Sequence, residues 1–174
     1  TLQQLTAQTV ETFEAQTINQ PNFTSNGKTF NLTNTYIAFQ VVTSPGYGYN
    51  GSNNYIQVSD GNASQSLGQT GFITAASGSF KMNSLWIYLT GTSGQTPNST
   101  SNGAPGSVTL TGKLGGVTQF SIVKNTTGAN IGTALPGNGF IPVNFATDGV
   151  SNFTNINIDQ LEIQLSANYD YFAI

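Results

Sequence analysis

The chain contains no histidine, no cysteine and no arginine, and only 6% of its residues are charged. Without histidine it cannot build a Ser-His-Asp triad, a histidine zinc site or an imidazole general base. Without cysteine it has neither disulfides nor thiolate chemistry, a composition that fits both exported bacterial surface proteins and cytosolic ones. These absences remove most catalytic chemistry, so we expect a protein that binds, displays or assembles.

Positive charge is sparse and scattered, because the four basic residues are single lysines, Lys28, Lys81, Lys113 and Lys124. Such a distribution offers no basic stripe for a phosphate backbone, which argues against a nucleic-acid partner. No apolar run approaches the roughly 20 residues that span a bilayer, so we predict no membrane insertion. The 37% apolar and 11% aromatic content supplies a core. We therefore expect a folded chain rather than a disordered one.

Apolar and polar residues alternate with a period of two along most of the chain, as β-strands require. In Ser84–Thr90, for example, Leu85 and Ile87 share one face while Trp86 and Tyr88 share the other. Ten such runs predict an all-β fold, a two-sheet antiparallel sandwich at 18–174. The predicted strands are Lys28–Thr33, Tyr36–Thr43, Asn54–Val58, Gly71–Thr74, Ser84–Thr90, Ser107–Lys113, Val117–Lys124, Gly139–Ala146, Ile156–Ser166 and Tyr169–Ile174.

Turn residues mark the connections between these strands. Gly115 and Gly116 supply the positive φ angles of a tight hairpin between Ser107–Lys113 and Val117–Lys124. Long loops are predicted at Ser44–Asn53, Ser59–Gln69, Gly91–Gly106 and Asn125–Asn138, where Gly, Asn, Ser and Pro accumulate. Residues Thr1–Thr17 form an N-terminal extension that is a short helix, an interdomain linker or an outer strand, three alternatives that stay open.

The best candidate ligand site is the loop Pro45–Tyr55, which interleaves tyrosines with asparagines. Sugars bind by stacking on flat rings while amides hydrogen-bond their hydroxyls, and Trp86 with Tyr88 forms a second flat platform. The alternative is that the amides make turns and the rings pack over the end of the sandwich or in its core. The candidate ligand-binding residues are Tyr47, Tyr49, Asn50, Asn53, Asn54, Tyr55, Trp86 and Tyr88.

Carboxylates are the remaining route to catalysis, since a glycosidase needs only a pair of them. None of the seven lies in a recognisable catalytic motif, and Glu162 alternates with Leu161 and Ile163 as a solvent-facing residue does. We therefore predict no catalytic residues and no cofactor. Asp60-Gly61-Asn62 is a fragment of a calcium-loop pattern that a turn also explains. The acids are Glu11, Glu14, Asp60, Asp148, Asp159, Glu162 and Asp170.

An ordered set of segments resembles the jelly-roll modules of secreted and cell-surface proteins of Bacteroidetes-type bacteria, many of them sorted by the type IX secretion route. The segments are Glu11–Glu14, Phe23–Phe30, Gly46–Asn53, Ser84–Tyr88, Leu110–Gly116 and Tyr171–Ile174. The resemblance implies a carbohydrate-binding-like jelly roll beside neighbouring domains of a larger secreted protein. In related modules acids near both termini hold a structural calcium, which here would involve Glu11 or Glu14, but the acid that follows the closing strand is missing.

We expect a secreted or cell-surface location, which the absence of a leader before Thr1 also favours. The leading hypothesis is a non-catalytic module that binds glycans or another cell-surface ligand, or mediates adhesion. The alternative is self-assembly, in which Thr1–Thr17 adds a strand to a neighbour's sheet edge in a filament or surface layer. A carboxylate glycosidase is the third hypothesis.

Overall fold

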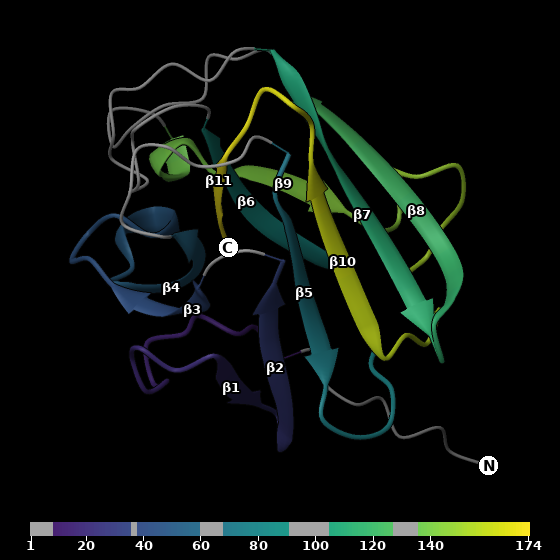
Figure 1. The fold of residues 1–174 in the computed structure, drawn as a ribbon, viewed down its shortest axis with the longest axis horizontal. Coiled ribbons are helices and arrows are strands. Elements are labelled where there is room, and N and C mark those ends of the chain that lie inside the picture. Colours follow the sequence, from purple (N-terminus) through teal and green to yellow (C-terminus); the bar gives the residue numbers. More distant parts are fainter. Residues whose placement is uncertain (1–8, 36–37, 60–67, 91–104, 127–135) are drawn as a thin grey trace.

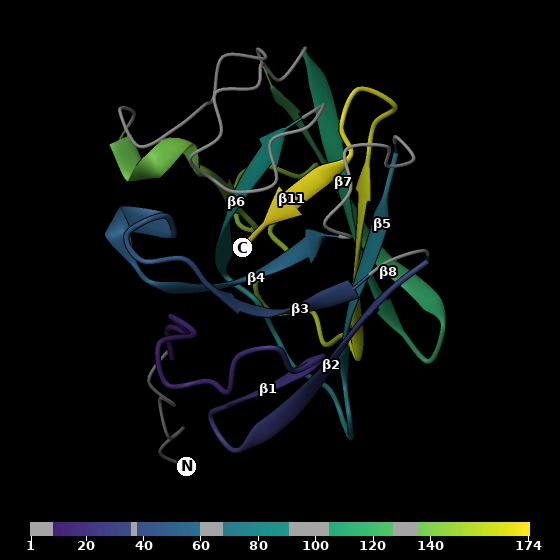
Figure 2. The ribbon, with the colours of Figure 1, turned by 60° about the vertical axis from the view of Figure 1, so that its left-hand side comes forward.

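A computed structural model describes residues 9–35, 38–59, 68–90, 105–126 and 136–174. The described strands form two antiparallel sheets, one in the order β1-β2-β5-β10-β7-β8 and one in the order β3-β4-β11-β6-β9. The strands are β1 Asn22–Ser25, β2 Lys28–Asn34, β3 Ala38–Thr43, β4 Asn54–Ser59, β5 Thr70–Ala75, β6 Ser84–Thr90, β7 Gly106–Leu114, β8 Val117–Thr126, β9 Ile141–Asn144, β10 Gln160–Leu165 and β11 Tyr171–Ala173. Figures 1 and 2 show the two sheets facing each other, which confirms the predicted all-β sandwich.

Alternation along the strands builds the core between the sheets. On β6, Leu85, Ile87 and Leu89 are at most 6% exposed and join the large inter-sheet cluster. They meet residues such as Leu110 on β7 and Leu161 on β10, both fully buried. Because the pleat sends alternate side chains to opposite faces, one face of each sheet is committed to this core.

All ten predicted strands are present within the described residues, with ends shifted by a few positions. The predicted hairpin is confirmed, since Gly115 and Gly116 have φ angles of 58° and 79° between β7 and β8. Strand β1 was not predicted. Its signal was the Asn26-Gly27 pair, whose positive φ angles of 49° and 72° make the turn into β2. The first two residues of the predicted strand Tyr36–Thr43 lie outside the described residues.

The N-terminal segment is neither a helix nor a strand over residues 9–17. Instead it packs on its own sandwich: Phe13, at a φ of 63°, is 7% exposed and belongs to the inter-sheet cluster. The side chain of Gln16 exchanges two hydrogen bonds with the backbone of Thr24 on β1. The expectations of a helix or an outer strand are therefore wrong for these residues, while 1–8 lie outside the described part.

Two short 3₁₀ helices lie in the long polar stretches, η1 at Tyr49–Gly51 and η2 at Pro136–Gly139. Figures 1 and 2 show these two coils next to each other beside the five-stranded sheet. Neither of these described helices has the length or apolar character needed to traverse a bilayer. Ser59–Gln69, Gly91–Gly106 and Asn125–Asn138, the other predicted loops, fall largely outside the described residues.

Candidate binding groove

The outer face of the five-stranded sheet carries a second apolar cluster beneath η1 and η2. Its buried aromatic members are Tyr55, Tyr88, Tyr171 and Phe140, with Tyr47 and Tyr49 packed against them. A sheet face that looks away from the main core is usually polar, but here the two loops cover it. The alternative reading of the aromatic loop, rings packed over the sandwich, is therefore realised for part of it.

Asn138 holds the two covering loops together. Its Nδ2 donates to the carbonyl oxygens of Gly46 and Gly48, at 2.9 Å and 2.7 Å. Gly137 makes the close approach to Tyr49 feasible, because a Cβ there would lie 2.9 Å from the Tyr49 ring. Ser44–Asn53 and the described end of the predicted loop Asn125–Asn138, residues 136–138, are thus joined and cover this face together.

Two of the predicted ring residues are buried below this cover and not available for stacking. Tyr55 is 1% exposed and Tyr88 is 0% exposed. The predicted platform of Trp86 and Tyr88 is therefore wrong, because Phe140 and Tyr171 pack around Tyr88. The ring that accompanies Trp86 is Tyr49, stacked on the indole with centroids 4.1 Å apart and planes at 20°. Trp86 keeps 36% of its surface exposed.

Burial favours the protonated hydroxyl at two tyrosines of this cluster, Tyr171 and Tyr55. Burial raises the pKa of Tyr171 well above its usual value, and the neighbouring Tyr55 and Tyr88 raise it further. The Tyr171 hydroxyl donates to Oε1 of Gln57 on β4 at 2.6 Å. Burial likewise raises the pKa of Tyr55. The Tyr171 hydroxyl is thus a structural donor, and the burial of both tyrosines keeps them from external ligands.

The predicted asparagines are exposed or half-buried around the loop. The side chains of two of them form hydrogen bonds to the backbone. Asn53 Oδ1 accepts the N–H of Gly46 at 3.2 Å. Asn54 donates through Nδ2 to the carbonyl oxygen of Phe13 at 3.3 Å. Asn50 is exposed in a left-handed turn at a φ of 52°. Asn53 and Asn54 thus fix the loop, whereas the side chain of Asn50 faces solvent.

Glu14 ties the aromatic loop to the N-terminal segment. Its Oε1 accepts the backbone N–H of Asn53 at 2.5 Å and that of Asn54 at 3.1 Å. The loop, the N-terminal segment and β4 therefore meet at one place. A surface groove of about 820 Å³ begins there and extends along β6 and the β1–β2 hairpin.

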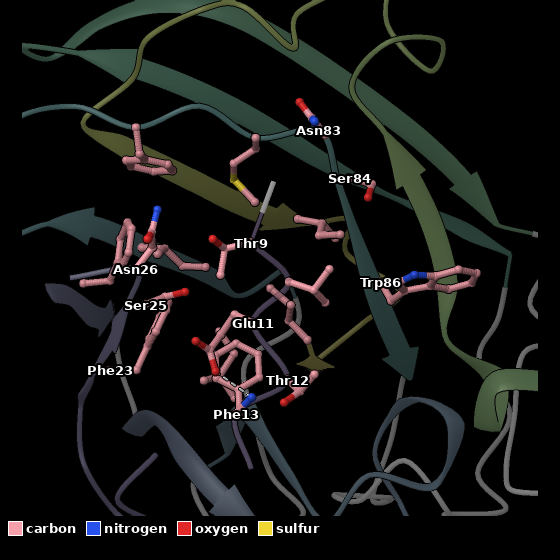
Figure 3. Close-up of a pocket in the computed structure, with 18 of the residues that line it drawn as sticks. Thr9, Glu11, Thr12, Phe13, Phe23, Ser25, Asn26, Asn83, Ser84 and Trp86 are labelled. Carbon is pink, nitrogen blue, oxygen red and sulfur yellow. Dashed lines mark hydrogen bonds between the residues drawn. The ribbon is translucent and has the colours of Figure 1, made fainter. Parts of the chain in front are cut away.

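Figure 3 shows the N-terminal residues in the middle of this groove, with the β1–β2 hairpin on one side and the start of β6 on the other. Trp86 stands at one end, apart from Phe23 and Ser25. Amides and hydroxyls make up much of its lining: Asn26, Asn54, Asn83, Asn155, Thr9, Thr12, Ser25, Ser52, Ser84 and Thr154. Of the predicted ligand residues, the groove includes Tyr49, Asn54, Tyr55 and Trp86 and leaves out Tyr47, Asn50, Asn53 and Tyr88.

Four phenylalanine rings follow one another along the groove. Phe13 meets Phe23 edge to face at 5.1 Å, Phe23 stacks on Phe30 at 5.0 Å, and Phe30 meets Phe80 edge to face at 5.1 Å. The Phe23 and Phe30 rings meet because the Asn26-Gly27 turn places them directly opposite on β1 and β2. Sequence reasoning missed this part of the groove, although the Asn-Gly pair flanked by alternating apolar residues was its signal.

The carboxylates are mostly engaged within the fold. Glu162 lies on the face of β10 opposite the buried Leu161 and Ile163, as the alternation predicted, but it is half-buried there and ion-paired with Lys113 at 2.5 Å. Asp148 pairs with Lys124 at 2.8 Å. Asp159 accepts the N–H of Gly115. Asp60 lies outside the described residues.

The two acids considered for calcium, Glu11 and Glu14, each accept hydrogen bonds from backbone N–H groups. Glu11 Oε1 accepts the N–H of Phe13 at 2.7 Å, and Glu14 accepts the two N–H groups of the aromatic loop. In the described ranges no group of three or more acidic residues is placed to hold a metal ion. The calcium fragment at Asp60–Asn62 lies outside those ranges.

No protein-family model matches the chain. No curated protein matches it. Among solved structures, the chain is similar to the crystal structure of a DUF4465 family protein from Bacteroides caccae, with 13% identity and a TM-score of 0.46. The similarity covers 92% of this chain and 84% of that chain. A likeness of this degree says nothing about a ligand or an activity.

Proposed function

We propose that this protein is a non-catalytic module that binds glycans in the groove between the β1–β2 hairpin, the N-terminal segment and β6. The observation that carries the proposal is the ring pair at the end of a groove lined with amides and hydroxyls, in which the 36% exposed Trp86 stacks on the half-buried Tyr49. A pyranose ring presents apolar C–H groups on its faces and hydroxyls at its rim. Rings and short polar side chains match those two surfaces, as in other ligand sites that combine apolar area with a few polar groups.

The distribution of acids supports binding without hydrolysis. A glycosidase places two carboxyl groups on either side of the scissile bond. Among the described residues that line the groove, Glu11 is the only acid, and its carboxylate accepts the Phe13 N–H. A bound sugar would therefore meet amides, hydroxyls and rings, with a single, already engaged carboxylate nearby.

The setting we propose is extracellular. The resemblance to Bacteroidetes jelly-roll modules favours a secreted or cell-surface module, with adhesion through glycans as its role, and the lack of cysteine is compatible with that location. Sorting by the type IX route and a jelly-roll connectivity are parts of the same proposal. A secretome fraction of the native host, probed with an antibody against this domain, would test the location.

The binding test is a glycan array followed by titration of the hits, monitored by the fluorescence of Trp86, the single tryptophan of the chain. Trp86→Ala and Tyr49→Ala are each expected to weaken binding by about tenfold or more, because a stacking face is lost. Tyr47→Ala is the matched control, since Tyr47 belongs to the same loop but does not line the groove. For the tryptophan variant, calorimetry replaces fluorescence.

Two outcomes would contradict the proposal. The first is an array without any reproducible hit. The second is a hit whose affinity is unchanged by Trp86→Ala and Tyr49→Ala. Conversion of a bound oligosaccharide to shorter products, measured by mass spectrometry, would show hydrolysis and would contradict the non-catalytic part of the proposal.

A further inference from the structure

The lysines divide into two groups with different environments. Lys113 and Lys124 are ion-paired with acids of the sandwich, at 2.5 Å and 2.8 Å. Lys28 and Lys81 form no ion pair with the described residues, and both line the groove. The chain as a whole carries a net charge of −3. With Glu11 as the one acid among the described lining residues, the two lysines give the groove a net charge of +1, opposite in sign to that of the molecule.

Each of the two lysines neighbours one ring of the Phe30–Phe80 pair. Lys28 and Phe30 are two residues apart on β2 and so share a face of the strand. Lys81 follows Phe80, whose ring meets that of Phe30 at 5.1 Å. Lys28 Nζ donates one hydrogen bond to the Ser77 carbonyl oxygen at 2.9 Å, which leaves two of its three ammonium donors for other partners.

From this arrangement we infer that the groove is specific for acidic glycans, whose sugar faces pack on the Phe30–Phe80 pair while their anionic groups bind Lys28 and Lys81. The inference rests on the proposed function, because it names the ligand class of the same groove. An ammonium group beside an apolar surface binds a carboxylate or sulfate by a charge-assisted hydrogen bond. The amides of the lining would contact the sugar hydroxyls.

The test uses calorimetric titration with tetragalacturonate and with its fully methyl-esterified form, which has the same backbone without the charge. We expect the charged form to bind about tenfold more tightly and to weaken as salt is raised from 50 to 500 mM. Lys28→Gln and Lys81→Gln should each weaken tetragalacturonate about threefold, the size of one partly exposed charge contact, so that the two losses together equal the tenfold preference. The double variant should bind the two forms equally.

The matched control is Val123→Glu with Val150→Glu, which changes the net charge by the same two units at exposed positions outside the groove. It should leave binding unchanged. A sulfated κ-carrageenan tetrasaccharide and its desulfated form separate the two anion sources: tight binding of the sulfated form alone would keep the inference and assign the anion as sulfate.

Other results overturn the inference. If neutral and charged forms bind equally in the native protein, or if polyglutamate of equal charge competes as well as the sugar, acidic-glycan specificity is wrong. Equal binding of neutral sugars would still leave the proposed glycan function standing. If no oligosaccharide binds, charged or neutral, both the inference and the proposed function fail.

Discussion

At the scale of single residues, Asn138 has the clearest structural role in the loops beside the groove. Its side chain joins η2 to the carbonyl oxygens of Gly46 and Gly48, and its backbone sits in the left-handed region at a φ of 57°. Through these bonds it holds the loop that carries Tyr49, and hence the ring pair at the groove's end.

We predict that Asn138→Ala lowers the free energy of unfolding by about 2 kcal/mol, because two part-buried hydrogen bonds are lost. Asn50→Ala is the control, since Asn50 has a similar φ of 52° and an exposed side chain. Both variants share the backbone strain, so their difference isolates the hydrogen bonds. Denaturant unfolding and Trp86 emission measure the effect. Equal destabilisation by the two variants would contradict the assigned role of Asn138.

At the scale of elements, β11 and β4 couple through Tyr171 and Gln57 in the cluster beneath the loops. The pKa of Tyr171 is raised by burial, so the folded state keeps the phenol proton at pH values where the unfolded chain has begun to lose it. The stabilisation is therefore complete below about pH 10, the ordinary tyrosine pKa, and is lost as pH rises above it.

The free energy of unfolding should consequently fall above pH 10, by up to about 1.4 kcal/mol per pH unit for each such tyrosine. Tyr171→Phe removes this titration, so its curve should fall less steeply than that of the native protein. The comparison uses denaturant midpoints between pH 8 and 11, and subtraction of the two curves cancels the lysines. Parallel curves would show that Tyr171 does not couple folding to pH.

At the scale of the whole molecule, the N-terminal segment closes the sandwich on its own chain. Asn19 donates its N–H to the Val41 carbonyl oxygen and Gln20 accepts the Val41 N–H, so this part of the outer edge of β3 is paired in cis. Donation of residues 9–17 to a neighbouring copy would have to withdraw Phe13 from the core. Self-assembly through residues 9–17 would therefore cost the free energy that the burial of Phe13 contributes to the fold.

We predict that Phe13→Ala lowers the free energy of unfolding by about 3 kcal/mol or more, since a 7% exposed ring leaves a cavity. Val10→Ala, in the same segment at 76% exposure, should change it by less than about 0.5 kcal/mol. Chemical denaturation measures both values, and light scattering at high concentration reports any association. A native-like stability of Phe13→Ala would mean that the segment is not packed in solution.

Much of the fold was readable from local patterns. Alternation identified every described strand except β1, because burial on one face of a pleat imposes a period of two. Gly115-Gly116 identified a hairpin because few other residues adopt its angles. About half of the predicted ligand residues line the groove, among them Tyr49 and Trp86. The lysines and phenylalanines of the groove were missed, since β2 and the connection before β6 are distant in sequence.

The sequence by itself determined that Trp86 and Tyr88 point to the same face of one strand, because the pleat is a local property of the backbone. Only the tertiary structure decided that Phe140 and Tyr171 bury Tyr88 while Trp86 stays 36% exposed. Which loop covers which part of a sheet depends on contacts between segments far apart in the chain. The alternation within β6 carries no information about these long-range contacts, and it is these contacts that place Trp86 at the groove.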